Sequence, residues 1–210
     1  MFIDVSRTIS PESVAYPGNR PLRFVQHGKL GVDSDFTEIW LEGFSGHVMT
    51  HVDMPCHVID GGKSLDDYEV SDFIFDAVVH EVPGDVINRD LIEGLPDVRG
   101  KAVLFKTRGS QLNDTDPFSQ NYVYIDASGA DALCEKGVAA VGIDYLSIDY
   151  LSIDLKEDSV AHTTLLGNEI LIFEAMQLRD AEPGEFKLYA FPLKIKGGDG
   201  SCVRAVLQTV

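Results

Sequence analysis

The segment Ala102-Val103-Leu104-Phe105-Lys106-Thr107 is a compact apolar run, which is typical of a buried strand. Residues 128–136 follow with the pattern of a helix, and Gly137 stands where such a helix would end. Val138-Ala139-Ala140-Val141-Gly142-Ile143 then has the composition of a second strand. This strand–helix–strand unit predicts an α/β domain.

Signals on both sides of this unit predict more strands than helices, and therefore a mixed sheet. We expect further strands at residues 37–44, 77–82, 188–195 and 203–207, and a short helix at residues 88–95. Pro192 favours an edge strand or a bulge at its position, because proline cannot donate a ladder hydrogen bond. No Gly-, Ser- or Pro-rich linker divides the 210 residues, so we expect a single domain spanning residues 1–210.

The composition excludes several classes of partner. The chain has 17 Lys and Arg against 34 Asp and Glu, a net charge of −17, which repels nucleic-acid phosphates and anionic membrane surfaces. It has no apolar run of about 18 residues and no basic-then-apolar leader pattern. Its three cysteines form neither a CxxC pair nor a disulfide framework. We therefore expect a cytoplasmic protein with no nucleic-acid or membrane partner.

The densest chemical signal is His47-Val48-Met49-Thr50-His51-Val52-Asp53-Met54-Pro55-Cys56-His57, which holds three of the six histidines. His47, His51, Asp53 and His57 would share one face of an extended chain, because alternate residues of a strand point the same way. His47 and His51 would then lie too far apart for one ion, so we expect a turn over 47–51. Pro55 disfavours a helix beyond it, so we expect an extended run over 53–57.

Two interpretations of this segment compete. A solvated strand face would account for one histidine, but four ligand-type residues within eleven favour a metal site. Nitrogen and carboxylate ligands suit zinc or manganese, whereas a structural thiolate site would need cysteines in a ligand pattern. Cys56 could act as a nucleophile, but buried packing is the favoured role because a metal site already activates water.

The same segment resembles the signature H-x-G-T-H-x-D-x-P-x-H of the cyclase family, which includes bacterial kynurenine formamidases and isatin hydrolases. It departs from that signature at Met49, where the family usually has glycine. Three weaker matches keep the family's order: Tyr16-Pro17-Gly18-Asn19; Gly142-Ile143-Asp144 with Ser152-Ile153-Asp154; and Asp199-Gly200-Ser201-Cys202-Val203-Arg204-Ala205. The resemblance thus extends over nearly the whole chain.

The resemblance implies a swivelling β/β/α fold, a homodimer or higher homo-oligomer, and a centre of two divalent metal ions, Zn²⁺ or Mn²⁺. By position it assigns the metal ligands as His47, His51, Asp53, His162 and Glu174, with Asp53 bridging. It assigns proton transfer to His57 and an aromatic contact with the substrate to Tyr16. Two such ions would lower the pKa of a shared water and polarise an amide carbonyl.

The implied activity is metal-dependent hydrolysis of a small amide, with an arylformamidase that converts N-formylkynurenine to kynurenine and formate as the leading hypothesis. An isatin hydrolase, or another enzyme that opens a cyclic amide, imide or lactone, is the first alternative, because fold does not determine substrate. A non-catalytic protein that binds metal or a small molecule is the second.

A short repeat interrupts the second half of the chain. Tyr145-Leu146-Ser147-Ile148-Asp149 is followed at once by Tyr150-Leu151-Ser152-Ile153-Asp154. An insertion of five residues would reverse the faces of a continuing strand, so we expect a loop or bulge to absorb it.

Overall fold

A mixed sheet organises the computed structural model, which describes residues 1–151 and 159–210. Its strands lie in the order β1 (Phe2–Asp4), β12 (Gly200–Thr209), β11 (Gly184–Pro192), β5 (Ile74–Glu81), β7 (Ala102–Lys106), β9 (Ala140–Ile143), β10 (Leu171–Glu174) and β4 (His51–Asp53). Strands β5, β7, β9 and β10 run parallel, and the other pairings are antiparallel. The α/β mixed-sheet prediction is confirmed.

The sheet closes on itself because β12 is long enough to pair with two strands along one edge. Its first residues, 200–202, pair with β4, and residues 206–208 pair with β1. Its other edge pairs with β11 along nearly the whole strand. The result is a barrel-like arrangement in which β4 is held between β10 and β12.

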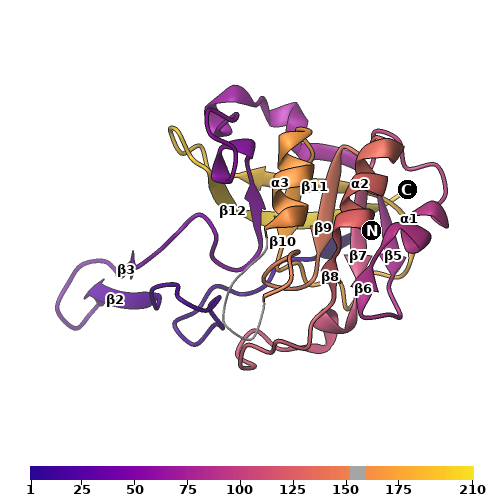
Figure 1. Cartoon of the computed structure of the whole chain (residues 1–210). Coiled ribbons are helices and arrows are strands. Elements are labelled where there is room, and N and C mark those ends of the chain that lie inside the picture. Colours follow the sequence, from indigo (N-terminus) through magenta and orange to yellow (C-terminus); the bar gives the residue numbers. More distant parts are fainter. Residues whose placement is uncertain (152–158) are drawn as a thin grey trace.

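Helices α1 (Arg89–Glu93), α2 (Ala127–Lys136) and α3 (Val160–Gly167) cover the outer face of the parallel strands (Figure 1). Asp126 caps α2 by accepting from the amide of Gly129, and Gly137 ends it in the left-handed conformation, as the sequence predicts. Strand β7 is buried on both faces. Ala102 and Leu104 face the inside of the barrel, whereas Val103 and Phe105 face the helices. This explains its continuous apolar run.

The remaining elements are short. They are β2 (Arg23–Gly28), β3 (Glu38–Glu42), β6 (Val86–Ile87), β8 (Tyr124–Ile125) and single-turn 3₁₀ helices at Pro55–His57, Leu65–Asp67, Val70–Phe73 and Arg108–Gln111. Within the described residues, no helix has the length and apolar character needed to cross a membrane.

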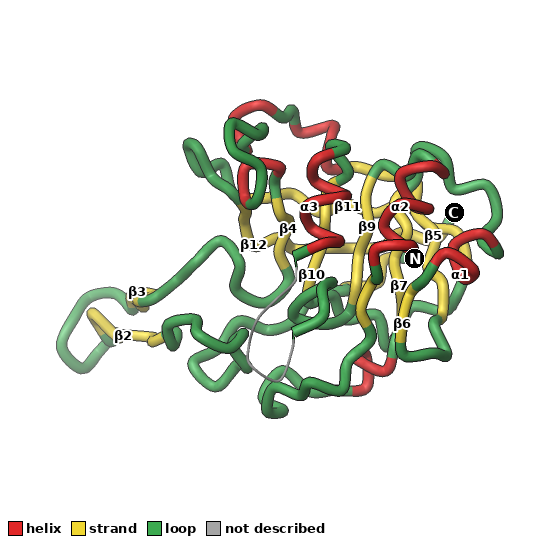
Figure 2. Tube along the Cα trace, viewed as in Figure 1, coloured by secondary structure: helices red, strands yellow, loops and turns green. Residues whose placement is uncertain are grey.

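Strands β2 and β3 form a hairpin that projects away from the barrel (Figures 1 and 2). The strand predicted at 37–44 therefore exists, but it does not belong to the core. All five residues of β3 are exposed, and Ile39, Trp40 and Leu41 each keep about half of their surface accessible, at 53%, 50% and 45%. The hairpin therefore exposes large apolar side chains to solvent.

The edge prediction for Pro192 is wrong for its strand, because β11 lies between β12 and β5. The pairing with β5 stops at Tyr189, however, and Pro192 is the last residue of β11. The missing amide therefore falls where the strand has only β12 as a neighbour, which makes the proline compatible with an interior strand.

Candidate metal centre

The turn at residues 46–50 and strand β4 position the densest group of ligand-type side chains. The predicted turn is present, and it leads into β4, whose three residues are all buried. The extended run expected over 53–57 holds through Met54 and is wrong beyond it, because Pro55–His57 forms a 3₁₀ turn. Proline suits the first position of such a turn, where its missing amide hydrogen costs nothing. The turn brings the His57 ring back against that of His47, with ring centroids 4.2 Å apart.

Two distant segments complete the group. Glu174 ends β10 and stands opposite His51 in the antiparallel pair of β10 and β4, so their side chains share a face of the sheet. His162 lies in the first turn of α3, beside β10. Helix α3 packs over the sheet and points this side chain toward Asp53 and Glu174. The structure thus brings together all five predicted ligand residues.

These residues form two sets that share one carboxylate. The outer triad is His47, His51 and Asp53, and the inner triad is Asp53, His162 and Glu174; in each, the ligand atoms lie within 4.8 Å of one another. Asp53 Oδ1 is 2.7 Å from His47 Nδ1 and 3.3 Å from His51 Nε2. Asp53 Oδ2 is 3.5 Å from His162 Nε2.

The donor set fits divalent metal ions. Asp53 Oδ2 is buried and accepts no hydrogen bond from any described residue, which is costly for a carboxylate oxygen without a cation. Three imidazoles and two carboxylates are ligands that zinc and manganese both accept. Because Asp53 belongs to both triads, the arrangement fits two ions with Asp53 between them.

Supporting hydrogen bonds fix the orientation of the ligands. His162 Nδ1 lies 2.5 Å from Asp149, which also accepts the amides of Ala161 and His162. His51 Nδ1 lies 2.7 Å from the carbonyl of Met49. Both imidazoles therefore turn Nε2 toward the centre, and such outer partners are known to tune metal sites.

Asp149 belongs to the candidate centre through its contact with His162, and it is absent from the residues expected from the sequence. The resemblance was placed on Ser152-Ile153-Asp154, the second copy of the repeat, which lies outside the described residues. The structure uses the first copy: the amide of Ile148 donates to Glu174, and Asp149 holds His162. The Ser-x-Asp pattern that could have identified Asp149 occurs twice, so the sequence alone could not choose between the copies.

Met49 adopts a positive φ of 54°, which non-glycine residues rarely do. This conformation turns its carbonyl toward His51, so the backbone strain serves the outer triad. The position where the family usually has glycine is therefore a left-handed one.

Opposite charges inside the two triads shift the pKa values strongly. Burial opposes the charged form of His51, but Asp53 outweighs burial and holds the pKa of His51 well above its ordinary value. Burial likewise opposes the charged form of His162, and Glu174 and Asp149 hold its pKa well above the ordinary value. The pKa of Asp53 lies well below its usual range, since the surrounding imidazoles outweigh burial. Without metal, the two carboxylates therefore favour the charged form of the imidazoles.

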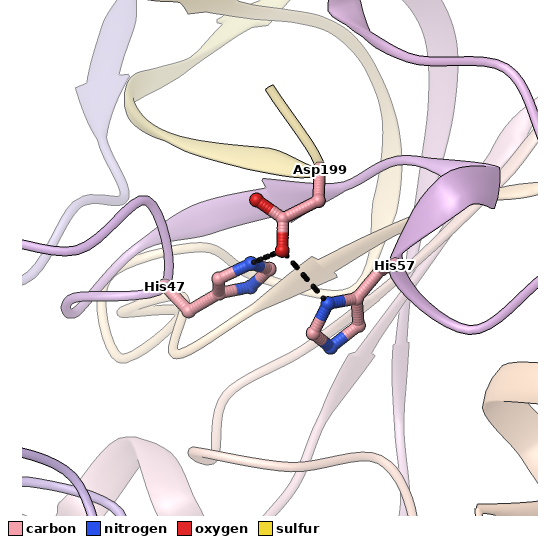
Figure 3. Close-up of side chains that lie close together, drawn as sticks. All are labelled: His47, His57 and Asp199. Carbon is pink, nitrogen blue, oxygen red and sulfur yellow. Dashed lines mark hydrogen bonds and ion pairs between the residues drawn. The ribbon is translucent and has the colours of Figure 1, made fainter. Parts of the chain in front are cut away.

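His57 and Asp199 border the outer triad. Asp199 Oδ2 lies 3.1 Å from His47 Nε2 and 3.3 Å from His57 Nδ1 (Figure 3). Among the described residues His57 pairs with Asp199 and not with Asp53 or Glu174, and the ligand atoms of His47, His57 and Asp199 lie within 4.8 Å of one another, so these three residues form a third group that could hold an ion. Asp199 was not predicted as a site residue, although the closing segment that begins with it was noted.

Two adjoining cavities open onto the centre. The larger, of about 440 Å³, includes Tyr16, Phe44, Met49 and Leu146 in its lining. The smaller, of about 250 Å³, reaches His57, His162 and Glu174, and both touch Tyr16, His47 and His51. The expected contact of Tyr16 with the substrate stays a prediction, with Tyr16 in the lining of both cavities. Cys56 lines neither cavity, and burial raises the pKa of its thiol, so the structure does not favour it as a nucleophile.

The model of the Cyclase family matches residues 3–150, which is more than half of the chain. The chain belongs to the cyclase family. A kynurenine formamidase of Salinibacter ruber is 34% identical over 208 residues, covering 98% of this chain and 96% of the relative. A kynurenine formamidase of Geobacillus thermodenitrificans is 30% identical, covering 99% and 97%.

Solved structures have the same fold as this chain. A potential metal-dependent hydrolase with cyclase activity superposes with a TM-score of 0.83 at 25% identity, covering 99% of this chain and 96% of that chain. An isatin hydrolase bound to thioisatinate gives a TM-score of 0.83 at 19% identity, covering 98% and 91%, and shows a shared fold. Given these full-length matches, the chain is a hydrolase rather than a non-catalytic binding protein.

Proposed function

We propose that this chain hydrolyses the formyl amide of an aryl amine, and specifically converts N-formylkynurenine and water to kynurenine and formate. The observation that carries the proposal is the sharing of Asp53 by two ligand triads beside a cavity whose lining combines apolar and aromatic side chains with polar ones. The full-length relatives named kynurenine formamidase support the choice of substrate.

The two triads would hold two divalent ions, Zn²⁺ or Mn²⁺. When bound, the ions supply an activated water and an electrophile for the amide carbonyl. The protein's own contribution is to keep Asp53 between the triads and to fix His51 and His162 through Met49 and Asp149. Burial of Asp53, His162 and Glu174 limits the access of bulk water to their two carboxylates and one imidazole.

His57 would give a proton to the departing amine. It borders the smaller cavity, beside both triads, and the single hydrogen-bond partner of its imidazole ring among the described residues is Asp199. Amide cleavage needs such a donor because an unprotonated amine leaves slowly. Tyr16 would stack on the aryl ring, since it lines both cavities and packs edge-on against Phe118 at 5.8 Å.

The proposal covers the assembly as well. We propose that residues 1–210 act as one unit in a cytoplasmic homo-oligomer with no nucleic-acid partner. The three free cysteines support a cytoplasmic location, and the net charge of −17 supports the absence of a nucleic-acid partner. The exposed apolar residues of the β2–β3 hairpin support association, because an isolated hairpin is only marginally stable in water.

A combined measurement of metal content and turnover tests the function. Purified protein is analysed for bound metal and assayed with N-formylkynurenine, isatin and a small cyclic imide. We expect two divalent ions per chain and preferential release of formate from N-formylkynurenine. Preferential opening of isatin or of the imide would overturn the substrate assignment, and metal-independent hydrolysis would overturn the mechanism.

A further inference from the structure

Asp199 has an exposed side chain on a firmly held backbone. Its carbonyl accepts the amide of Met54 at 2.9 Å, and the next residue, Gly200, pairs with Asp53 across the β12–β4 ladder. The backbone that carries Asp199 is therefore tied to the strand that carries the shared ligand. Gly200 also makes room for the outer triad, because a Cβ at this position would approach the His47 ring to 2.5 Å.

One oxygen of Asp199 serves two histidines. Oδ2 lies 3.1 Å from His47 Nε2 and 3.3 Å from His57 Nδ1, and Figure 3 shows both rings directed at this atom. A carboxylate can only accept, so each of these ring nitrogens must carry the hydrogen. By the same argument His47 Nδ1, 2.7 Å from Asp53 Oδ1, carries a hydrogen in the metal-free protein, and a metal ion ligated by Nδ1 would displace this hydrogen and leave the one on Nε2. His57 Nε2 points away from Asp199 (Figure 3).

We propose that Asp199 is a positioning residue that fixes the tautomers of His47 and His57 together, and so couples the metal ligand to the proton-transfer residue. This inference rests on the proposed function, in which His47 ligates through Nδ1 and His57 exchanges its proton through Nε2. Asp199 presents the correct nitrogen of each ring.

The physical need is clearest for His57. Its side chain is 32% exposed, and Asp199 is the single hydrogen-bond partner of its imidazole ring among the described residues. Without Asp199, the ring could flip and protonate on either nitrogen, and only some of the molecules would have the productive form. Carboxylates that orient a histidine in this way control catalysis in hydrolase triads. For His47, Asp199 would orient a metal ligand through a hydrogen bond to the ring nitrogen that does not face the metal.

A double-mutant cycle with a matched control tests the proposal. Zinc-loaded wild type, Asp199→Asn, His57→Ala and the double variant are compared by metal affinity, kcat, KM and ¹⁵N NMR of the histidine tautomers. The control is Asp66→Asn, because Asp66 accepts the amide of Gly197 in the same loop at 2.8 Å and belongs to none of the candidate ligand groups. It removes the same charge and disturbs the same loop.

We expect Asp199→Asn to lower kcat by about 10–100-fold with little change in KM, and to weaken zinc binding by about 10-fold. NMR should show mixed tautomers for His57, and in the His57→Ala background the same substitution should lower kcat by less than about threefold. Asp66→Asn should resemble wild type in every measurement.

Three results would overturn the proposal. They are unchanged histidine tautomers in Asp199→Asn, additive losses of kcat in the cycle, or loss of a whole zinc ion per chain, which would make Asp199 a ligand. The NMR and zinc-binding measurements do not depend on the substrate. If wild type fails to hydrolyse N-formylkynurenine, the proposed function fails while these two measurements still decide the role of Asp199.

Discussion

The two triads that share Asp53 are built in different ways. In the inner triad, Asp53, His162 and Glu174 are buried, with exposed fractions of 0%, 6% and 4%. They are held by paired strands, by the start of α3 and by Asp149. In the outer triad, His47 lies on an irregular turn, is partly exposed and contacts the exposed side chain of Asp199.

The difference concerns how firmly each triad is held. Regular secondary structure fixes the inner triad, so its geometry is set by the fold itself. The outer triad lies at the larger cavity, uses the strained backbone of Met49 and adjoins His57. Strain and exposure of this kind are concentrated at sites that meet substrate. The inner triad is therefore the more firmly held of the two, although His162 and Glu174 line the smaller cavity beside His57 and so also face the substrate space.

Removing the shared residue should have the largest effect. Asp53→Ala takes a ligand from both triads at once, so we expect both metal ions to be lost together. Turnover should fall by roughly 10³-fold or more, because ions at such a site supply several kcal/mol of transition-state stabilisation. Elemental analysis and kcat on one preparation measure both effects, with circular dichroism to confirm folding. Full metal occupancy in this variant would contradict the assignment.

Substitution of His57 tests whether this residue transfers a proton or ligates metal beside the outer triad. His57→Ala should retain both ions, since it removes no ligand. Turnover should fall by roughly 10²–10⁴-fold, the usual contribution of a general acid–base group. The loss should shrink for formanilides with electron-withdrawing substituents, whose amines leave more easily. If metal is lost, His57 is a ligand; if the rate is unchanged, it has no part in the mechanism.

The support of the inner triad can be tested alone. Asp149→Asn should weaken binding of the inner ion by about 10–100-fold and spare the outer ion, because it disturbs only the partner of His162. Asp126→Asn is the matched control, since Asp126 likewise accepts an amide at a helix start but lies at α2. Titration with zinc resolves the two binding steps. Equal weakening of both steps would remove the distinction between the triads.

The raised histidine pKa values predict that metal binding releases protons. The pKa of His162 lies well above its ordinary value of 6.5, so this imidazole is protonated in the metal-free protein at and above pH 6.5. A metal must displace that proton, so affinity should rise with pH by about tenfold per unit for each proton displaced. Calorimetry in buffers of different ionisation heat counts the protons. Affinity that is independent of pH would show that the imidazoles start neutral.

The positive φ of Met49 predicts that glycine is more stable than alanine at this position, the reverse of the usual order. Met49→Gly and Met49→Ala both remove the buried side chain, but only glycine adopts a φ of 54° without strain. The glycine variant should therefore exceed the alanine variant in unfolding free energy by about 1 kcal/mol, whereas glycine is usually the less stable of the two. Urea unfolding compares them. A more stable alanine variant would show that Met49 is relaxed in solution.

The sequence predicts the local parts of this fold and misses the closure of the barrel. Strand β7, helix α2 and strand β9 are correctly expected because periodicity, a cap and Gly137 act within a few residues. The pairing of β12 with β4 joins residues about 150 positions apart, and no local pattern encodes it. The hairpin strand β3 has the composition of a core strand, and only the structure shows that it is exposed.

The candidate site divides in the same way. The five candidate ligand residues were expected because three of them lie in a segment that matches a family signature and the resemblance assigns His162 and Glu174 by position; the structure brings all five together. Asp149 was missed because the repeat offers two equivalent copies. Asp199 was missed because a lone aspartate near the chain end acquires meaning only when β12 places it beside His47 and His57.

Anomalous X-ray diffraction at the zinc edge, on crystals of the zinc-loaded protein, tests the shared centre most directly. The account predicts two peaks, one on each side of the Asp53 carboxylate, the first also bounded by His47 and His51 and the second by His162 and Glu174. A single peak, or a peak among His47, His57 and Asp199 in place of one of these two, would contradict it.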